Sequence, residues 1–347
     1  MKRLGKGLYD RIISMENLWA ADAKAQMGKK GRDEVMEHNK HQAEDLQALH
    51  VMLRDKTYKP SPYRIFHVHE PKEREIAALP FFPDRIIHHA IMNVLEPTWK
   101  HTFTYNSYAC IRGRGISACA KHVRRIIDDY VRRDERCYCL KIDVRHFYPS
   151  INGEVLKSII RRRVKCKDTL WLLDTIIDSA QGLPIGNYVS QYLANLYLAP
   201  FMHKMTDEVK VECVEYSDDM VFFSADKAGL HSLLNHTIRP YLQDVLRLEV
   251  KGNWQVFPIA TNRYAHDGRA LDFVGYTFYR EHTGLRKRVK KNFARSIARL
   301  HKHGVSGRRL AIKAASWTGW CKHADCKHLT TSIMGKETKF VKYLKAS

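Results

Sequence analysis

Acidic side chains are scarce in this chain. Its 347 residues include 37 Asp and Glu against 59 Lys and Arg, which gives a formal net charge of +22. Between Glu281 and Asp325 there are no acidic residues at all, and this stretch begins with the basic run Arg286-Lys287-Arg288. Such a balance favours a polyanionic partner, although a ribosomal or membrane-surface protein would carry the same charge.

A secretory leader, an internal repeat and a low-complexity tract are also missing. Charges are spread through residues 1–19, so we expect a cytoplasmic protein of bacterial or phage origin. Without repeats, one interwoven domain with a C-terminal appendage is the simplest organisation. The longest uncharged run, residues 179–202, is long enough to mimic a membrane span, but Gly182, Pro184 and Gly186 favour a loop that leads into a buried helix. We therefore expect no membrane partner.

Eight cysteines lie in or beside apolar segments, as reduced core cysteines do. One cluster in the C-terminal region could be written as a compact zinc site, formed by Cys321, His323, Cys326 and His328. Its spacing is too tight for the usual two-cysteine, two-histidine arrangement. An ordinary helical tail is the preferred interpretation.

Apolar periodicity predicts the main elements. Residues 1–60 are expected to be helical, and residues 63–79 to form strands. A helix carrying Ile87 and Ile91 on one face should follow and end at Pro97.

Carboxylates mark the ends of two predicted strands. Residues 137–143 alternate as a strand should and end in Asp143. Further along, Tyr216-Ser217-Asp218-Asp219 reads as the tip of a tight turn between two apolar strands. An isolated Asp-Asp pair is usually a solvated turn. Here, however, adjacent carboxylates between apolar strands need a compensating cation, and two such strand ends at one sheet edge would make a two-metal phosphoryl-transfer site.

The order of an aspartate strand, a glycine-containing loop with a helix, and a Tyr-x-Asp-Asp hairpin resembles the palm of reverse transcriptases. The resemblance implies an α+β right-hand polymerase, with a helical extension at residues 1–60, interwoven fingers and palm at 61–280, and a basic helical thumb at 281–347. It implies RNA-directed DNA polymerase activity with two Mg²⁺ ions held by Asp143, Val144 and Asp218, supported by Asp219.

The same resemblance assigns binding roles to further residues, for each of which an ordinary strand, core or turn role is the alternative. Tyr148 would lie under the sugar of the incoming nucleotide and exclude a 2′-hydroxyl. The strand expected at residues 246–251 would bring Lys251 to the leaving pyrophosphate. The full nucleotide-binding set is Lys72, Arg74, Tyr148, Ile185, Gly186, Gln191 and Lys251. Template and primer would meet Arg112, Arg114, Gly275, Arg286, Lys287 and Arg288.

The subfamily is indicated by Ile185-Gly186 and Ser190-Gln191. Most reverse transcriptases carry Gln-Gly and Ser-Pro at these places, and the replacement resembles the enzymes of diversity-generating retroelements. Partners implied by that resemblance are a structured template RNA, a primer-template duplex, deoxynucleoside triphosphates and a pentameric basic accessory protein, with frequent errors opposite template adenine. A retron or group II-like reverse transcriptase and a non-catalytic RNA-binding relative are the alternatives.

Overall fold

The computed structural model describes residue 5 and residues 7–69 and 73–335. Within this part of the chain, two compact units form, each assembled from separate stretches of sequence. The first takes Met1–Arg112, Asp143–Lys210 and His236–Gly252, and the second takes Gly113–Ile142, Val211–Asn235 and Asn253–Ser347. The predicted domain boundaries at residues 60 and 280 stay a prediction. The two compact units do not test them, because stretches of both units alternate along the chain.

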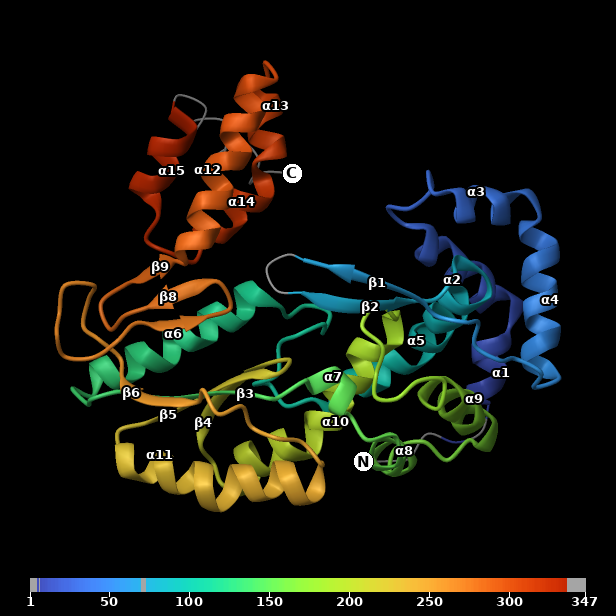
Figure 1. The fold of residues 1–347 in the computed structure, drawn as a ribbon, viewed down its shortest axis with the longest axis horizontal. Coiled ribbons are helices and arrows are strands. Elements are labelled where there is room, and N and C mark those ends of the chain that lie inside the picture. The colour runs from blue at the N-terminus through green and yellow to red at the C-terminus, as the bar shows by residue number, and fades with distance from the viewer. Residues whose placement is uncertain (1–4, 6, 70–72, 336–347) are drawn as a thin grey trace. The chain divides into compact units, whose positions relative to one another are not determined.

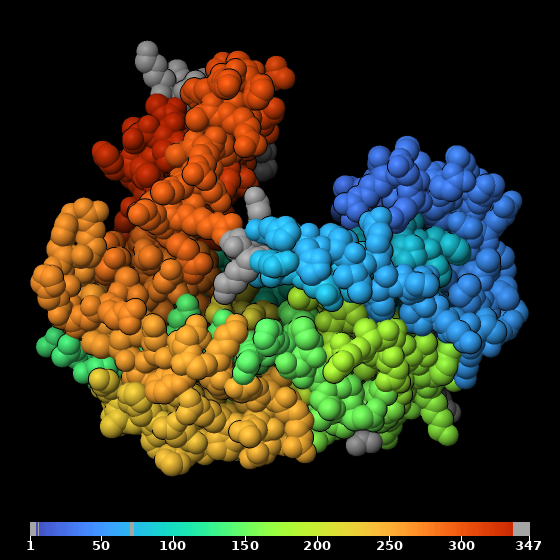
Figure 2. All heavy atoms as spheres, viewed as in Figure 1, coloured from blue at the N-terminus to red at the C-terminus, as the bar shows by residue number. Residues whose placement is uncertain are grey.

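Helices dominate the first unit, and a two-stranded antiparallel hairpin is added to them (Figure 1). Its helices are α1 Leu8–Ile13, α2 Met15–Gln26, α3 Asp33–Lys40, α4 Gln42–Arg54, α5 Ile86–Trp99, α7 Phe147–Ser150, α8 Gly153–Arg161, α9 Lys167–Ile177 and α10 Tyr188–His203. Short helical turns of this unit are η1 Phe81–Arg85, η2 Lys100–Thr102, η3 Lys204–Glu208 and η5 Tyr241–Val245, and η4 Leu234–Ile238 crosses from the second unit into the first. The hairpin strands are β1 Arg64–Val68 and β2 Arg74–Ala78, and this hairpin lies at the surface, light blue in Figure 2.

The predicted helical extension is confirmed for the described residues, and Leu46, Leu49 and Leu53 of α4 are fully buried. A buried ion cluster joins three of its helices. His38 of α3 lies between Asp22 of α2, at 3.2 Å, and Asp45 of α4, at 2.6 Å. Burial opposes a charged imidazole, but the hydrogen bonds to Asp22 and Asp45 outweigh it and raise the pKa of His38. The cluster therefore holds a cation between two carboxylates.

Helices α5 and α10 supply much of the core of the first unit. The uncharged run forms a loop and then α10, which is buried over most of its length, as predicted. Pro97 was expected to end α5, but it lies inside the helix, which continues to Trp99. A proline in the last turn removes only the bond that its N–H would donate to Asn93, and the almost complete burial of Trp99 holds that turn in place.

A four-stranded sheet, in the order β4-β5-β3-β6, is the centre of the second unit. Helices α6 and α11 pack against it (Figure 1). The strands are β3 Tyr138–Asp143, β4 Glu212–Tyr216, β5 Asp219–Ser224 and β6 Gln255–Pro258, and the helices are α6 Ile116–Arg132 and α11 Lys227–Leu233.

A second, three-stranded antiparallel sheet leads into the C-terminal helices of this unit. The sheet contains β7 Leu271–Phe273, β8 Tyr276–Phe278 and β9 Thr283–Leu285, and the helices are α12 Lys287–Lys302, α13 Gly307–Lys313, α14 Ala315–Cys321 and α15 Lys327–Met334. As predicted, Phe293 and Ile297 form the buried face of α12, with Leu300 packed beside them. The Tyr276 hydroxyl donates to the Trp320 carbonyl at 3.0 Å and joins the sheet to these helices.

Across the described residues, no helix combines the length and the apolar character that crossing a bilayer requires.

Candidate functional site

The acidic turn lies at the end of a rigid hairpin. Tyr216 pairs with Asp219, so Ser217 and Asp218 form a two-residue connection. Ser217 has a φ of +60°, the left-handed conformation that two-residue hairpin turns require. Both strands are buried, which fixes the direction of the turn. We predicted that both carboxylates lie at the tip of the turn. Asp218 does, but Asp219 is the first residue of β5.

Asp143, the last residue of β3, forms an ion pair with Lys251. The Lys251 N–H also donates to the Asp143 carbonyl at 2.9 Å, and Val144 forms an antiparallel bridge with Val250. Residues 246–251 were predicted to be a strand, but only this bridge forms. Arg247 adopts a left-handed φ of +53°, which breaks the extended conformation.

Oxygen ligands at the two strand ends have the chemistry that Mg²⁺ prefers. The Asp143 carboxylate and the Val144 carbonyl stand at the end of β3, and the Asp218 carboxylate stands in the β4–β5 turn. The Asp143 carboxylate already pairs with a cation, the Lys251 ammonium. Among residues 7–69 and 73–335, no three His, Cys, Asp or Glu side chains gather into a ready metal cluster.

Several predicted nucleotide-binding residues come together in the first unit. The Leu183 N–H donates to the Tyr148 carbonyl at 2.8 Å, and the Ala77 N–H donates to the Ile185 carbonyl at 2.9 Å. These bonds place the loop carrying Ile185 and Gly186 between the Tyr148 segment and strand β2. Of the two residues that the prediction assigns to the phosphates, Arg74 is the exposed first residue of β2, whereas Lys72 lies outside the described residues.

Other side chains in this region differ in burial. Tyr148 is half-buried beside the buried Phe147, and Gln191 is exposed in the first turn of α10. Sequence reasoning missed Asn187, whose amide donates to the Tyr63 hydroxyl at 3.1 Å and ties the loop down. The local sequence carries no sign of this contact, because the two residues are 124 positions apart.

Gly182 makes the tightest approach in this loop. A Cβ at this position would lie 2.5 Å from the Pro149 carbonyl oxygen, and φ is +69°. We expect Gly182→Ala to lower the free energy of unfolding by roughly 1–3 kcal/mol, because a strained backbone has to be accommodated. Urea denaturation measures this loss. Gly31→Ala, where a Cβ would meet open space, is the matched control and should change stability by less than about 0.5 kcal/mol. Equal losses in both variants would contradict the close approach.

The predicted template and primer residues lie in loops and at the start of α12. Arg112 is exposed, and Arg114 lies between Gly113 and Gly115, both of which have positive φ. Gly275 forms the predicted turn together with Val274, and a Cβ there would lie 2.5 Å from the ring of Trp320.

Arg286 forms an ion pair with Asp272 through its guanidinium, and its contact with template or primer stays a prediction. Lys287 and Arg288 occupy the exposed first turn of α12.

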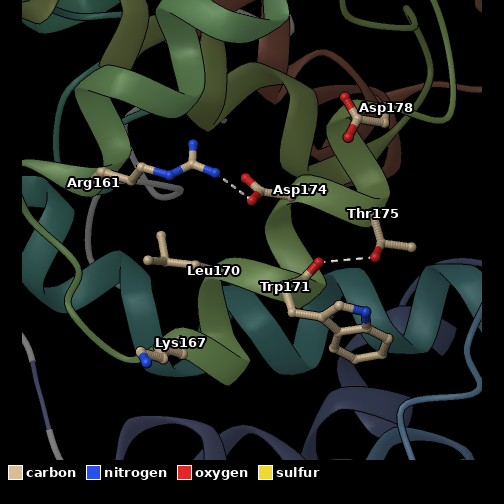
Figure 3. Close-up of a pocket in the computed structure, with 7 residues that line it drawn as sticks. All are labelled: Arg161, Lys167, Leu170, Trp171, Asp174, Thr175 and Asp178. Atoms are coloured by element: carbon tan, nitrogen blue, oxygen red, sulfur yellow. Dashed lines mark hydrogen bonds and ion pairs between the residues drawn. The ribbon is translucent and has the colours of Figure 1, made fainter.

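A hollow of about 460 Å³ lies away from these residues, between α8 and α9 (Figure 3). Arg161 Nη2 is 2.6 Å from Asp174 Oδ2 within it. Burial raises the pKa of Asp174 despite this pairing. None of its lining residues was predicted to bind a nucleotide.

The cysteine and histidine cluster forms no metal site within the described residues. Cys321 ends α14 and Cys326 precedes α15, so a turn divides the expected helical tail into two helices. A hydrogen bond from Cys326 lowers the pKa of Cys321 to about 7.

Comparison with known proteins relates these features to a family. A family profile described as Reverse transcriptase (RNA-dependent DNA polymerase) matches residues 68–251. Protein YkfC of Escherichia coli (strain K12) is 25% identical over 173 residues, which cover 46% of this chain and 45% of YkfC. Nuclear intron maturase 4, mitochondrial, of Arabidopsis thaliana is 27% identical over 149 residues, which cover 38% of this chain and 17% of the maturase. The chain thus spans less than half the length of these curated relatives.

Two solved structures share the fold. Apo telomerase of Candida tropicalis, truncated from its C-terminal domain, has a TM-score of 0.50 at 13% identity and covers 65% of this chain and 56% of its own. Telomerase of the same organism in complex with a TWJ fragment of telomeric RNA has a TM-score of 0.52 at 12% identity, over 83% of this chain and 55% of its own. With the antiparallel sheets described above, this likeness confirms the predicted α+β right-hand polymerase fold.

Proposed function

This chain belongs to the reverse transcriptase family, and from this we propose that it is an RNA-directed DNA polymerase of a diversity-generating retroelement. The observation that supports polymerase activity is the pair of aspartates at strand ends, Asp143 on β3 and Asp218 in the turn that leads into β5. The second part depends on Ile185-Gly186 and Ser190-Gln191, which stand where most of the family has Gln-Gly and Ser-Pro.

In this proposal Asp143, Asp218 and the Val144 carbonyl hold two Mg²⁺ ions, and Asp219 supports Asp218. Bound Mg²⁺ would lower the pKa of the primer 3′-hydroxyl and neutralise the charge of the triphosphate, and these residues would hold the ions while the nucleotide is transferred to that hydroxyl and pyrophosphate leaves. Lys251, held against Asp143, supplies a proton to the pyrophosphate that leaves.

Residues near the loop at 182–186 select the nucleotide. Tyr148, half-buried and fixed through its carbonyl by Leu183, stands under the sugar and excludes a 2′-hydroxyl. Arg74 and Lys72 orient the triphosphate, since guanidinium groups match phosphate oxygens. Ile185, Gly186 and Gln191 border the new base pair.

This chemistry and the charge of +22 support a structured template RNA and the growing primer-template duplex as partners, with deoxynucleoside triphosphates as substrates. The resemblance to diversity-generating retroelements adds a pentameric basic accessory protein, and we propose the cytoplasm of a bacterium or a phage-infected cell as the setting. Arg112, Arg114, Arg286, Lys287 and Arg288 would contact the phosphates of template and primer, because cationic side chains bind phosphates without regard to sequence. Gly275 would lie at the turn of the hairpin that holds the primer end.

A group II-like reverse transcriptase is the second candidate. The similarity to a nuclear intron maturase favours it, whereas Ile185 and Gln191 depart from the residues that such enzymes carry. Copying fidelity separates the two candidates.

The resemblance to diversity-generating retroelements implies that errors opposite template adenine exceed those opposite G, C or U. Ile185 would lower fidelity, because it offers apolar packing where a polar contact would test pair geometry. Apolar packing discriminates by only ~1–3 kcal/mol. Since the backbone of Ile185 is bound by Ala77, Ile185→Gln should keep the loop in place and still shift the adenine error rate more than the others. Sequencing complementary DNA copied from one defined RNA measures both effects. Equal error rates at all four bases in the wild type would reject the retroelement assignment, and an unchanged spectrum in Ile185→Gln would exclude a role for this side chain.

A further inference from the structure

The loop Ala260–Arg269, which joins β6 to β7 in the second unit, exposes an aromatic side chain. Tyr264 is 72% exposed, more than any other large apolar or aromatic side chain in the described part of the chain. Burial of such a ring against a partner is favourable. Within the chain, Arg263 donates a hydrogen bond to the Tyr264 hydroxyl. We call this segment the Arg263–Tyr264 loop.

Internal hydrogen bonds fold this loop in advance of any ligand. The Asn262 side-chain oxygen accepts the N–H groups of Tyr264, at 3.0 Å, and Ala265, at 3.1 Å. The Asp267 carboxylate accepts the Thr261 N–H at 3.1 Å. At the ends of the loop, the Ala260 N–H donates to the Arg269 carbonyl at 3.0 Å. A partner would therefore meet a preorganised surface and would not have to order a flexible segment.

One arginine stacks on the exposed ring, and a second contacts the same loop. The guanidinium carbon of Arg263 lies 4.4 Å from the centroid of the Tyr264 ring. Arg136, an exposed residue after α6, donates to the Asp267 carbonyl at 2.7 Å and so stands against the same loop.

The two nearby carboxylates are already engaged. Asp267 accepts hydrogen bonds from Thr261, and Glu281 accepts the Asn262 amide at 3.1 Å. Both carboxylates help to fold the loop and keep their charge, and the exposed arginines Arg136, Arg263 and Arg269 outnumber them there.

An exposed aromatic ring among arginines is the combination that holds single-stranded nucleic acid, since every base offers a π-face and every phosphate a charge. Protein interfaces also use Tyr and Arg, but the +22 charge of the chain favours a polyanion. We propose that the Arg263–Tyr264 loop binds single-stranded RNA, with a base stacked on Tyr264 and phosphates beside Arg263 and Arg136. The identification of that RNA with the template rests on the proposed function.

Fluorescence anisotropy with a labelled oligouridine about 20 nucleotides long tests this binding, with the full-length chain. Tyr264→Ala should weaken affinity roughly tenfold, whereas Tyr264→Phe, which keeps the ring, should bind like the wild type. Arg263→Ala should weaken binding and lower the salt slope by about one. Arg54→Ala removes an exposed arginine from α4 and is the matched control, with affinity near that of the wild type.

Two outcomes would overturn the proposal. One is unchanged RNA affinity in both Tyr264→Ala and Arg263→Ala, and the other is an equal loss in Tyr264→Phe and Tyr264→Ala. Primer extension on a pre-annealed duplex is measured separately. If the wild type fails to extend a primer and Tyr264→Ala still weakens RNA binding, the proposed polymerase function fails while the RNA-binding loop stands.

Discussion

Asp218→Asn is expected to reduce DNA synthesis on an RNA template by more than about 100-fold. Removal of even an outer-shell partner of a metal ligand costs ~10–100-fold, and here the charged ligand itself is lost. The turn should keep its shape, because asparagine has the size of aspartate and the register of β4 and β5 depends on the backbone. Primer extension with Mg²⁺ measures the loss.

RNA affinity provides the control for this variant. Basic surfaces supply the binding energy, so Asp218→Asn should bind an RNA-DNA duplex as tightly as the wild type. A polymerisation rate within threefold of that of the wild type would exclude Asp218 as a metal ligand. A parallel loss of RNA binding would show that the substitution disturbs the fold.

Replacement of His38, the histidine of the buried ion cluster, should have a large effect on stability. His38→Leu leaves Asp22, which is fully buried, without its cation. Breaking a buried ion pair in this way costs about 3–5 kcal/mol, which urea denaturation measures. Asp22→Asn in the same variant should recover part of the loss, because the unpaired charge is then removed. His41→Leu, on an exposed histidine of the same region, should cost less than about 0.5 kcal/mol.

The ion cluster also predicts a pH dependence. The pKa of His38 is raised above its usual 6.5, so its stabilisation is complete below pH 6.5 and is lost as the pH rises through the folded-state pKa. Burial acts to raise the pKa of Asp22, but hydrogen bonds from His38, Gln42 and Gln26 lower it below 3.8. The contribution of Asp22 is therefore present above pH 3.8 and lost as the pH falls through its folded-state pKa. A stability difference between wild type and His38→Leu that grows above pH 6.5 would contradict this assignment.

Elements set by neighbouring residues could be predicted well. The hairpin around Asp218 forms because apolar strands flank a short polar connection, and α12 forms because Phe293 and Ile297 recur at helical spacing. In both cases the interactions that decide the structure lie within a few residues, so the pattern is present in the printed sequence.

Predictions from local conformational preference were wrong where contacts with distant parts of the chain determine the conformation. Residues 246–251 have the composition of a strand, yet Val250 forms one bridge, to Val144, and the rest follows the packing around it. Pro97 has the usual features of a helix end, yet burial of Trp99 carries α5 past it. Tertiary packing outweighed a weak local signal at both places.

The charge environment of the site depended entirely on such distant contacts. Lys251 pairs with Asp143, which lies 108 positions away in the chain, and Arg286 pairs with Asp272. The sequence shows which residues have ionisable side chains and which of them stand at the ends of predicted strands. Which cation meets which carboxylate depends on how separate stretches pack into one unit, because a hydrogen bond or an ion pair forms only when the fold brings its two atoms to within about 3–4 Å.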